Sequence, residues 1–181
     1  MIVELVGPSG AGKSTLVGAL TDELGAGAVV PWSTLVTDRA GLRWIRDPHA
    51  VNLVADVTAL PPFVASLGRH GAFVRFAVRR LIQHAPSAFA MANYARNVIR
   101  KVGVYELARR DPGPIHLLDE GPILSAYQLF GYARGPISPI DLARFARLVP
   151  LPDLVVHVRA PLDVLERRAL DRRDRRRELA G

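Results

Sequence analysis

A glycine-rich segment near the N-terminus carries the clearest chemical signal. In GPSGAGKST, residues 7–15, two glycines, a lysine and a hydroxyl follow the spacing GxxxxGK[ST]. Glycines allow positive φ angles and a close approach of backbone N–H groups to an anion. The lysine can reach phosphate oxygens and the serine hydroxyl can bind Mg²⁺. The segment therefore predicts a phosphate-binding loop formed by Gly7, Pro8, Ser9, Gly10, Ala11, Gly12, Lys13, Ser14 and Thr15.

The alternative is a chance match in a glycine-rich turn, but the elements around this segment favour phosphate binding. The apolar run Ile2–Val6 predicts a strand that is buried on both faces, as in a parallel sheet. Residues 13–24 show helical spacing of apolar side chains and end at Gly25. A helix that starts at Lys13 would point its positive dipole end at the bound phosphate.

Two adjacent carboxylates follow a second predicted buried strand. The turn Asp111–Pro114 precedes the apolar run Ile115–Leu118, which ends at Asp119 and Glu120. Asp119 is the candidate for the Mg²⁺ side of the site, together with Ser14. Glu120 is the candidate base that takes a proton from an attacking hydroxyl or water. The structural alternative is a pair of carboxylates at a strand-to-loop junction.

The remaining pattern alternates short strands with helices. Such alternation predicts a three-layer α/β fold with a mainly parallel sheet and one domain over residues 1–181. A helical insert is expected at about residues 31–111, broken at Pro61-Pro62. The other predicted elements are a strand at 28–30, helical pieces at 50–60, 72–83 and 86–110, a helix at 138–149, a strand at 154–158 and a final helix from Pro161.

Composition says more about the cellular compartment than about the function. The chain has no cysteine, which suits a reducing cytoplasm, and no apolar run long enough to span a membrane. Its net charge of +7 comes from 22 arginines and two lysines. That charge suits nucleic acid, an anionic membrane face or a phosphorylated small molecule equally well. We expect a small-molecule partner, no nucleic acid and no membrane span, and we leave a homodimer open.

The C-terminal stretch Leu151–Glu178, LPDLVVHVRAPLDVLERRALDRRDRRRE, resembles the fourth strand and lid of thymidylate kinases and deoxynucleoside kinases. The resemblance also covers the phosphate loop well and the Asp119 strand fairly, but hardly covers Pro31–Arg110. It implies a P-loop NTPase fold with ATP as phosphate donor and Mg²⁺ as metal. Four positions match the lid arginines of those kinases loosely: Arg167, Arg168, Arg172 and Arg173. The alternatives for this stretch are a solvated basic helix and a patch that faces RNA or a membrane.

The sequence departs from those kinases at two points, which concern the acceptor site and the contacts to the nucleobase. Glu120 stands where they usually have an arginine that contacts phosphate. The sequence also stops at Gly181, where that family usually has one more strand and helix, so either the sheet lacks its last strand or the chain is truncated. The contacts to the nucleobase therefore stay unassigned.

The acceptor side is predicted just after the second strand. Trp32, Asp38, Arg39 and Arg43 lie near the expected mouth of the site, where Asp38 could orient a hydroxyl and the arginines could bind an anionic group. The alternative is a core tryptophan and solvated arginines.

The whole pattern predicts an ATP-dependent kinase, with Lys13, Asp119, Glu120, Arg168 and Arg172 as its catalytic residues. A nucleoside or nucleotide is the favoured acceptor. One alternative is a kinase of a non-nucleotide metabolite or drug, such as a sugar or a shikimate-like acid. The other is an ATPase or a nucleotide-gated interaction protein, in which Asp119 and Glu120 serve as metal ligand and water base.

Overall fold

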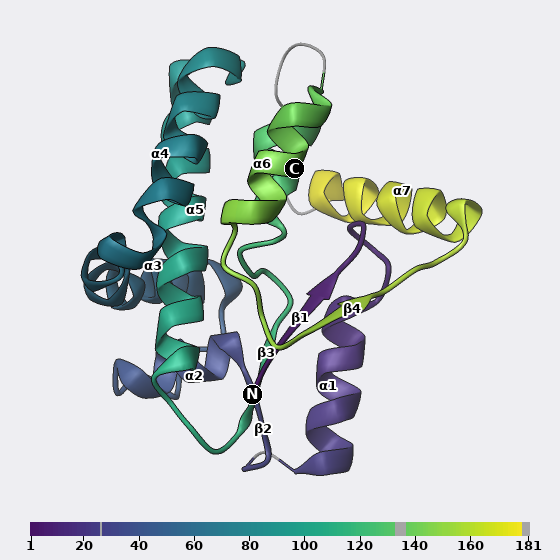
Figure 1. The fold of residues 1–181 in the computed structure, drawn as a ribbon. Coiled ribbons are helices and arrows are strands. Elements are labelled where there is room, and N and C mark those ends of the chain that lie inside the picture. Colours follow the sequence, from purple (N-terminus) through teal and green to yellow (C-terminus); the bar gives the residue numbers. More distant parts are fainter. Residues whose placement is uncertain (26, 133–136, 179–181) are drawn as a thin grey trace.

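The chain forms an α/β structure around a four-stranded sheet in which every neighbouring pair of strands is parallel (Figure 1). The computed structural model describes residues 1–25, 27–132 and 137–178, with side chains as far as Asp171. The strands are β1 (Ile2–Val6), β2 (Val29–Pro31), β3 (Ile115–Leu118) and β4 (Leu154–His157), in the order β2-β3-β1-β4. The predicted α/β class and parallel sheet are confirmed.

One face of the sheet packs against helix α1 (Lys13–Leu24). Alternate strand residues point to this face, as the two-residue period of a strand requires. Val3, Leu5 and Leu117 are buried there against Leu16 and Leu20 of the helix. The strand, loop and helix at the N-terminus have the bounds that the sequence predicts. The residues of the glycine-rich loop therefore lie at the carboxyl end of β1.

Four helices lie between β2 and β3, which confirms the predicted helical insert, and three of them pack on the opposite face of the sheet (Figure 1). They are α2 (Trp32–Arg39), α3 (Pro48–Ala65), α4 (Leu67–His84) and α5 (Ala88–Arg109). Ile2 and Leu118 of the sheet share a buried cluster with Val36, Ala55 and Val104 of these helices. Helices on both faces of a parallel sheet are compatible with the three-layer arrangement.

The predicted break at Pro61-Pro62 is wrong, because both prolines lie inside α3. Pro62 and Phe63 are buried, so tertiary packing holds the last turn of the helix despite the lost backbone hydrogen bonds. The break comes at Ser66, where α3 and α4 meet at a bend of 113°. The Ser66 hydroxyl donates to the carbonyl of Phe63 at this bend, 2.8 Å away.

Three helical segments complete the described structure: the π-helical turn η1 (Tyr127–Gly131), α6 (Pro139–Leu148) and α7 (Leu162–Glu178). Ser138 caps α6, the helix predicted at 138–149, by accepting a hydrogen bond from the Asp141 N–H. α7 follows β4 and folds back toward the glycine-rich loop (Figure 1). Within the described ranges, no single helix is long and apolar enough to cross a membrane, although the bent pair α3 and α4 is so in combined length and composition.

Candidate functional site

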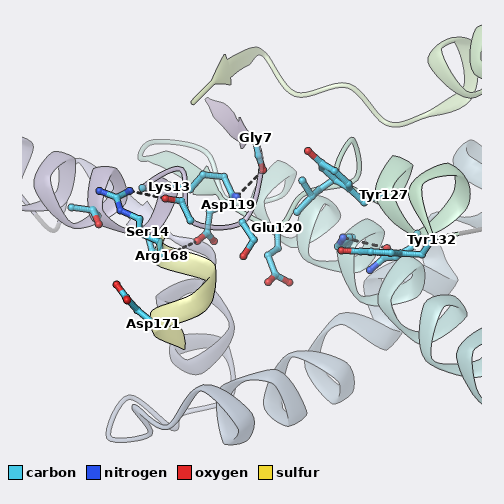
Figure 2. Close-up of a pocket in the computed structure, with 16 residues that line it drawn as sticks. Gly7, Lys13, Ser14, Asp119, Glu120, Tyr127, Tyr132, Arg168 and Asp171 are labelled. Atoms are coloured by element: carbon cyan, nitrogen blue, oxygen red, sulfur yellow. Dashed lines mark hydrogen bonds between the residues drawn. The ribbon is translucent and has the colours of Figure 1, made fainter. Parts of the chain in front are cut away.

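A cavity of about 750 Å³ opens where the glycine-rich loop, the end of β3 and helices α5 and α7 meet. This volume lies within the range of small-molecule sites, roughly 300–1,000 Å³. We call the part lined by the loop, Asp119, Arg168 and Asp171 the loop side. The tyrosine side is lined by Lys101, Glu120, Leu124, Tyr127, Gln128 and Tyr132. Figure 2 shows Tyr127 and Tyr132 at the end of the cavity opposite Arg168 and Asp171.

The glycines of the loop adopt backbone conformations that other residues rarely take. Gly7, Gly10 and Gly12 have φ angles of 148°, 91° and 101°. A Cβ atom at Gly7 would overlap the carbonyl oxygen of Val158, so this position has no room for a side chain. Gly12 is the N-cap of α1 and has no capping side chain. The loop thus joins a strand to a helix N-terminus, the arrangement that binds phosphate in many proteins.

Lys13 folds back over this loop. Its Nζ donates to the carbonyl oxygens of Gly7, at 2.8 Å, and Pro8, at 3.1 Å (Figure 2). An ammonium group has three N–H donors, and an anion is a stronger acceptor than a neutral carbonyl. The lysine is therefore placed at the cavity wall with donors that a phosphate could take over.

Asp119 is held by donors from two different elements. The Ser14 hydroxyl donates to its Oδ2 at 3.0 Å, and the indole Nε1 of Trp32 donates to its Oδ1 at 2.5 Å. The first contact joins the start of α1 to the end of β3, as the predicted metal pair requires. Trp32 was predicted on the acceptor side, but the structure places its polar atom on the metal candidate.

The residues on the loop side fit Mg²⁺ bound mainly through phosphate. Mg²⁺ prefers one or two protein oxygens together with water and substrate phosphates. Ser14 and Asp119 supply such a pair beside the loop. Throughout the described part of the chain, no group of three or more His, Cys, Asp or Glu residues could hold a metal without a substrate.

Glu120 lies on the tyrosine side of the cavity and is half exposed. Its Oε2 is 3.6 Å from Nη2 of Arg100, a buried residue of α5. The same guanidinium lies 3.5 Å from Asp56 of α3. Glu120 therefore reaches the cavity while a buried arginine fixes its orientation.

Among the described side chains of the C-terminal tract, Arg168 is the arginine that contacts the loop. Arg168 donates from Nη1 to the carbonyl oxygen of Gly10 at 2.6 Å. Asp171, one turn further along α7, also lines the cavity. Arg167 is exposed and is not among the lining residues. The side chains of Arg172 and Arg173 lie outside the described part of the structure.

The other residues predicted for the acceptor lie elsewhere. Asp38 and Arg43 form an ion pair of 2.8 Å and line a second cavity of about 650 Å³, next to α2 and the start of α3. Arg39 is exposed and lines neither cavity. The structure therefore does not bring these three residues to the glycine-rich loop.

The tyrosine side contains residues that the sequence did not single out. Lys101 of α5 is only 4% exposed, yet it lines this side of the cavity. Its Nζ donates to Oε1 of Gln128 over a long 3.4 Å. Tyr132 stacks on Tyr94 of α5, with ring centroids 6.3 Å apart. One signal was available in the sequence, since Lys101 is one of only two lysines.

A buried carboxylate supports the segment that carries these groups. Glu4 of β1 is fully buried and accepts hydrogen bonds from the N–H groups of Ile123, at 3.3 Å, and Leu124, at 3.0 Å. Gly121 packs so closely that a Cβ there would overlap the Glu4 carboxylate. Burial raises the pKa of Glu4 to about 7, although both backbone donors and Lys101 act to lower it.

Comparison with known proteins gives no further information about the site. No protein-family model, curated protein or solved structure matches the chain. The functional argument therefore depends on the site itself.

Proposed function

We propose that this chain is an ATP-dependent phosphotransferase that moves the γ-phosphate of ATP to a small-molecule acceptor. A nucleoside or nucleotide is the favoured acceptor, in line with the resemblance of the loop and the C-terminal stretch to thymidylate and deoxynucleoside kinases. The observation that carries the proposal is the Ser14 to Asp119 hydrogen bond beside a glycine-rich loop. This contact supports the proposal because it brings two oxygen ligands of the kind Mg²⁺ accepts to a loop of the kind that binds phosphate.

Each residue on the loop side has a defined task in this proposal. The loop N–H groups and Lys13 bind the β- and γ-phosphates, and the α1 dipole adds to their attraction. Ser14 and Asp119 hold Mg²⁺, which supplies positive charge next to the phosphates when it is bound. Arg168 already contacts the loop at Gly10, so α7 can bring a guanidinium to the transferred phosphoryl group.

Glu120 acts on the acceptor. For a hydroxyl acceptor, its carboxylate takes the proton as the acceptor oxygen bonds to the γ-phosphorus. The bond between that phosphorus and the bridging oxygen breaks at the same time, and ADP leaves. The pairing of Glu120 with Arg100, at 3.6 Å, orients the carboxylate for this step. The cavity volume leaves room for donor and acceptor together.

ADP release from Mg²⁺ and ATP, measured with and without a panel of acceptors, tests the proposal. The panel contains nucleosides, nucleoside monophosphates, sugars and small hydroxy acids. We expect one class to raise ADP release at least about tenfold, with label from the γ-phosphate recovered on the acceptor. The Lys13→Ala variant should lose this activity by a factor on the order of 100, because a charge next to the developing negative charge is removed.

The exposed Arg75→Ala variant, changed on α4, is the matched control and should keep full activity. Hydrolysis that no acceptor stimulates, and that disappears in Lys13→Ala and Glu120→Gln, would instead favour an ATPase. If ATP with Mg²⁺ produces no thermal shift at all, both functions lose their basis.

A further inference from the structure

Lys101 is a buried cation with unused hydrogen-bonding capacity. Its residue is 4% exposed, in the part of α5 whose neighbouring residues Val102 and Val104 belong to the core. Burying an ammonium group is costly unless charged or polar partners compensate it. Among the described residues, its hydrogen bond to Gln128 at 3.4 Å is the only one, and no carboxylate lies within 4.0 Å.

The nearby carboxylates of Glu120 and Glu4 both act to raise the pKa of Lys101, but neither is hydrogen-bonded to it. Glu120 lies closer to Arg100, at 3.6 Å, and that arginine also lies 3.5 Å from Asp56. Glu4 is fully buried, and the pKa of about 7 that burial gives it leaves it only partly ionised at neutral pH. Burial likewise lowers the pKa of Lys101 to about 8, so the amine still carries its charge at pH 7 in most molecules. A cation thus faces the cavity without a full counter-charge.

We infer that Lys101 binds an anionic group of the acceptor, a phosphate or a carboxylate, on the tyrosine side of the cavity. This inference rests on the proposed function, because it assigns the phosphate loop to the donor. A bound anion would give the ammonium the short, charge-assisted hydrogen bonds that it lacks. Leu124 and the two tyrosine rings line the same side and suit an apolar or ring-shaped part of that acceptor.

The position of Lys101 explains how the chain can do without an arginine at position 120. The lysine comes from α5, whereas Glu120 follows β3, and both line the same side of the cavity. The anion and the proton acceptor are thus supplied by two different elements. An acceptor with an anionic group is therefore preferred over a neutral one of the same size.

Amine labelling tests the inference without relying on catalysis. The chain has two lysines, and the exposed α-amine of Met1 serves as an internal reference. The Lys13→Ala variant is acetylated at pH 7.5 with or without inorganic phosphate or acetate, and the sites are quantified by mass spectrometry. We expect an anion to slow labelling of Lys101 at least about threefold and to leave Met1 unchanged. Protection by phosphate alone or by acetate alone identifies the preferred group.

Kinetics provide the second readout. In Lys101→Met the KM for an anionic acceptor should rise about 10- to 100-fold, the loss expected for one charged hydrogen bond, while the KM for ATP stays within twofold. Lys101→Arg should recover part of this loss. Arg79→Met, an exposed change on α4 with the same loss of charge, is the control.

Three results would overturn the assignment of Lys101. They are labelling of Lys101 that neither anion slows, equal turnover of neutral and anionic acceptors, and an unchanged acceptor KM in a folded Lys101→Met protein. If instead ATP fails to bind but phosphate still protects Lys101, the proposed kinase function is wrong and the anion site remains.

Discussion

The hydroxyl of Ser14 donates to the carboxylate of Asp119 across a separation of 105 residues, with an oxygen-to-oxygen distance of 3.0 Å. The contact requires β1 and β3 to be parallel neighbours, because only then do the start of α1 and the residue after β3 meet at one edge of the sheet. The pair is thus a direct product of the sheet order. It also places the proposed metal ligands beside the glycine-rich loop.

Removing either member of this pair should weaken the metal site. We expect Ser14→Ala and Asp119→Asn to raise the Mg²⁺ concentration needed for ATP-induced thermal stabilisation by about 10- to 100-fold. Asp22→Asn, an exposed change on α1, should leave this titration unchanged. If all three variants titrate like the unmodified protein, Ser14 and Asp119 do not hold the metal.

Trp32 should act as a positioning residue for Asp119. Trp32→Phe keeps the ring that packs against the core cluster but removes the Nε1 donor to Oδ1. We expect weaker Mg²⁺ binding, by up to about tenfold, with little loss of thermal stability.

Fluorescence provides the measurement, because the chain has two tryptophans and Trp44 is largely exposed. In Trp44→Phe the remaining signal comes from Trp32 and should change as Mg²⁺ and ATP bind. A signal that stays constant while the thermal midpoint rises would show that Trp32 does not sense the metal.

The position of the glycine-rich loop and the meeting of Ser14 with Asp119 could be predicted from the sequence because their signals are local. Glycine spacing, one lysine and an apolar run before Asp119 each determine their own surroundings. The tyrosine side could not be predicted in this way. Lys101 reaches the cavity only because α5 packs against β1, and nothing in its neighbours along the chain indicates that packing.

Two of the residues predicted for the acceptor lie in a different place. Asp38 and Arg43 follow β2 closely, but α2 carries them into a separate cavity. On α4, Arg75 and Arg79 are exposed, whereas Arg80 is buried, 2.7 Å from Asp141 and over the ring of Phe130. Spacing along a helix shows which residues share a face, but the tertiary fold decides which polar residues find a buried partner.

Gly7 should tolerate no side chain. In Gly7→Ala a Cβ would overlap the carbonyl oxygen of Val158, and the φ angle of 148° is strained for alanine. We expect a loss of at least about 1–3 kcal/mol in the free energy of unfolding. Urea titration measures it.

Gly18→Ala is the matched control for that experiment. Gly18 lies in α1 with open space around its Cβ position. This change should stabilise the protein, by up to roughly 1 kcal/mol, because alanine favours a helix more than glycine does. Equal effects of the two substitutions would contradict the close approach of Val158, the residue after β4, to Gly7.

Arg168 should contribute more to kcat than Arg167, its neighbour in sequence. We expect Arg168→Ala to lower kcat by about 10- to 1,000-fold with a smaller change in the KM for ATP, because a lid cation acts mainly on the transferred phosphoryl group. Arg167 is exposed and outside the cavity, so Arg167→Ala should change kcat less than twofold. If Arg167→Ala lowers kcat more than Arg168→Ala does, Arg167 rather than Arg168 acts on the transferred phosphoryl group.

The stability of the protein should depend on pH through Glu4. Burial raises the pKa of this carboxyl from 4.5 to about 7, so the folded state binds a proton more tightly than the unfolded state does. The stabilisation is complete below pH 4.5 and is lost as the pH rises through 7. A shift of this size corresponds to about 3 kcal/mol in the free energy of unfolding.

Urea titrations between pH 5 and 7.5 isolate this effect, because the opposite contribution of Lys101 begins only near its pKa of about 8. We expect the unmodified protein to lose stability over this range relative to Glu4→Gln, whose amide oxygen can still accept from Ile123 and Leu124. Glu23→Gln, an exposed change on α1, should keep the slope of the unmodified protein. Parallel curves for the unmodified protein and Glu4→Gln would mean that Glu4 is ionised throughout, with Lys101 as its counter-ion rather than free for an acceptor.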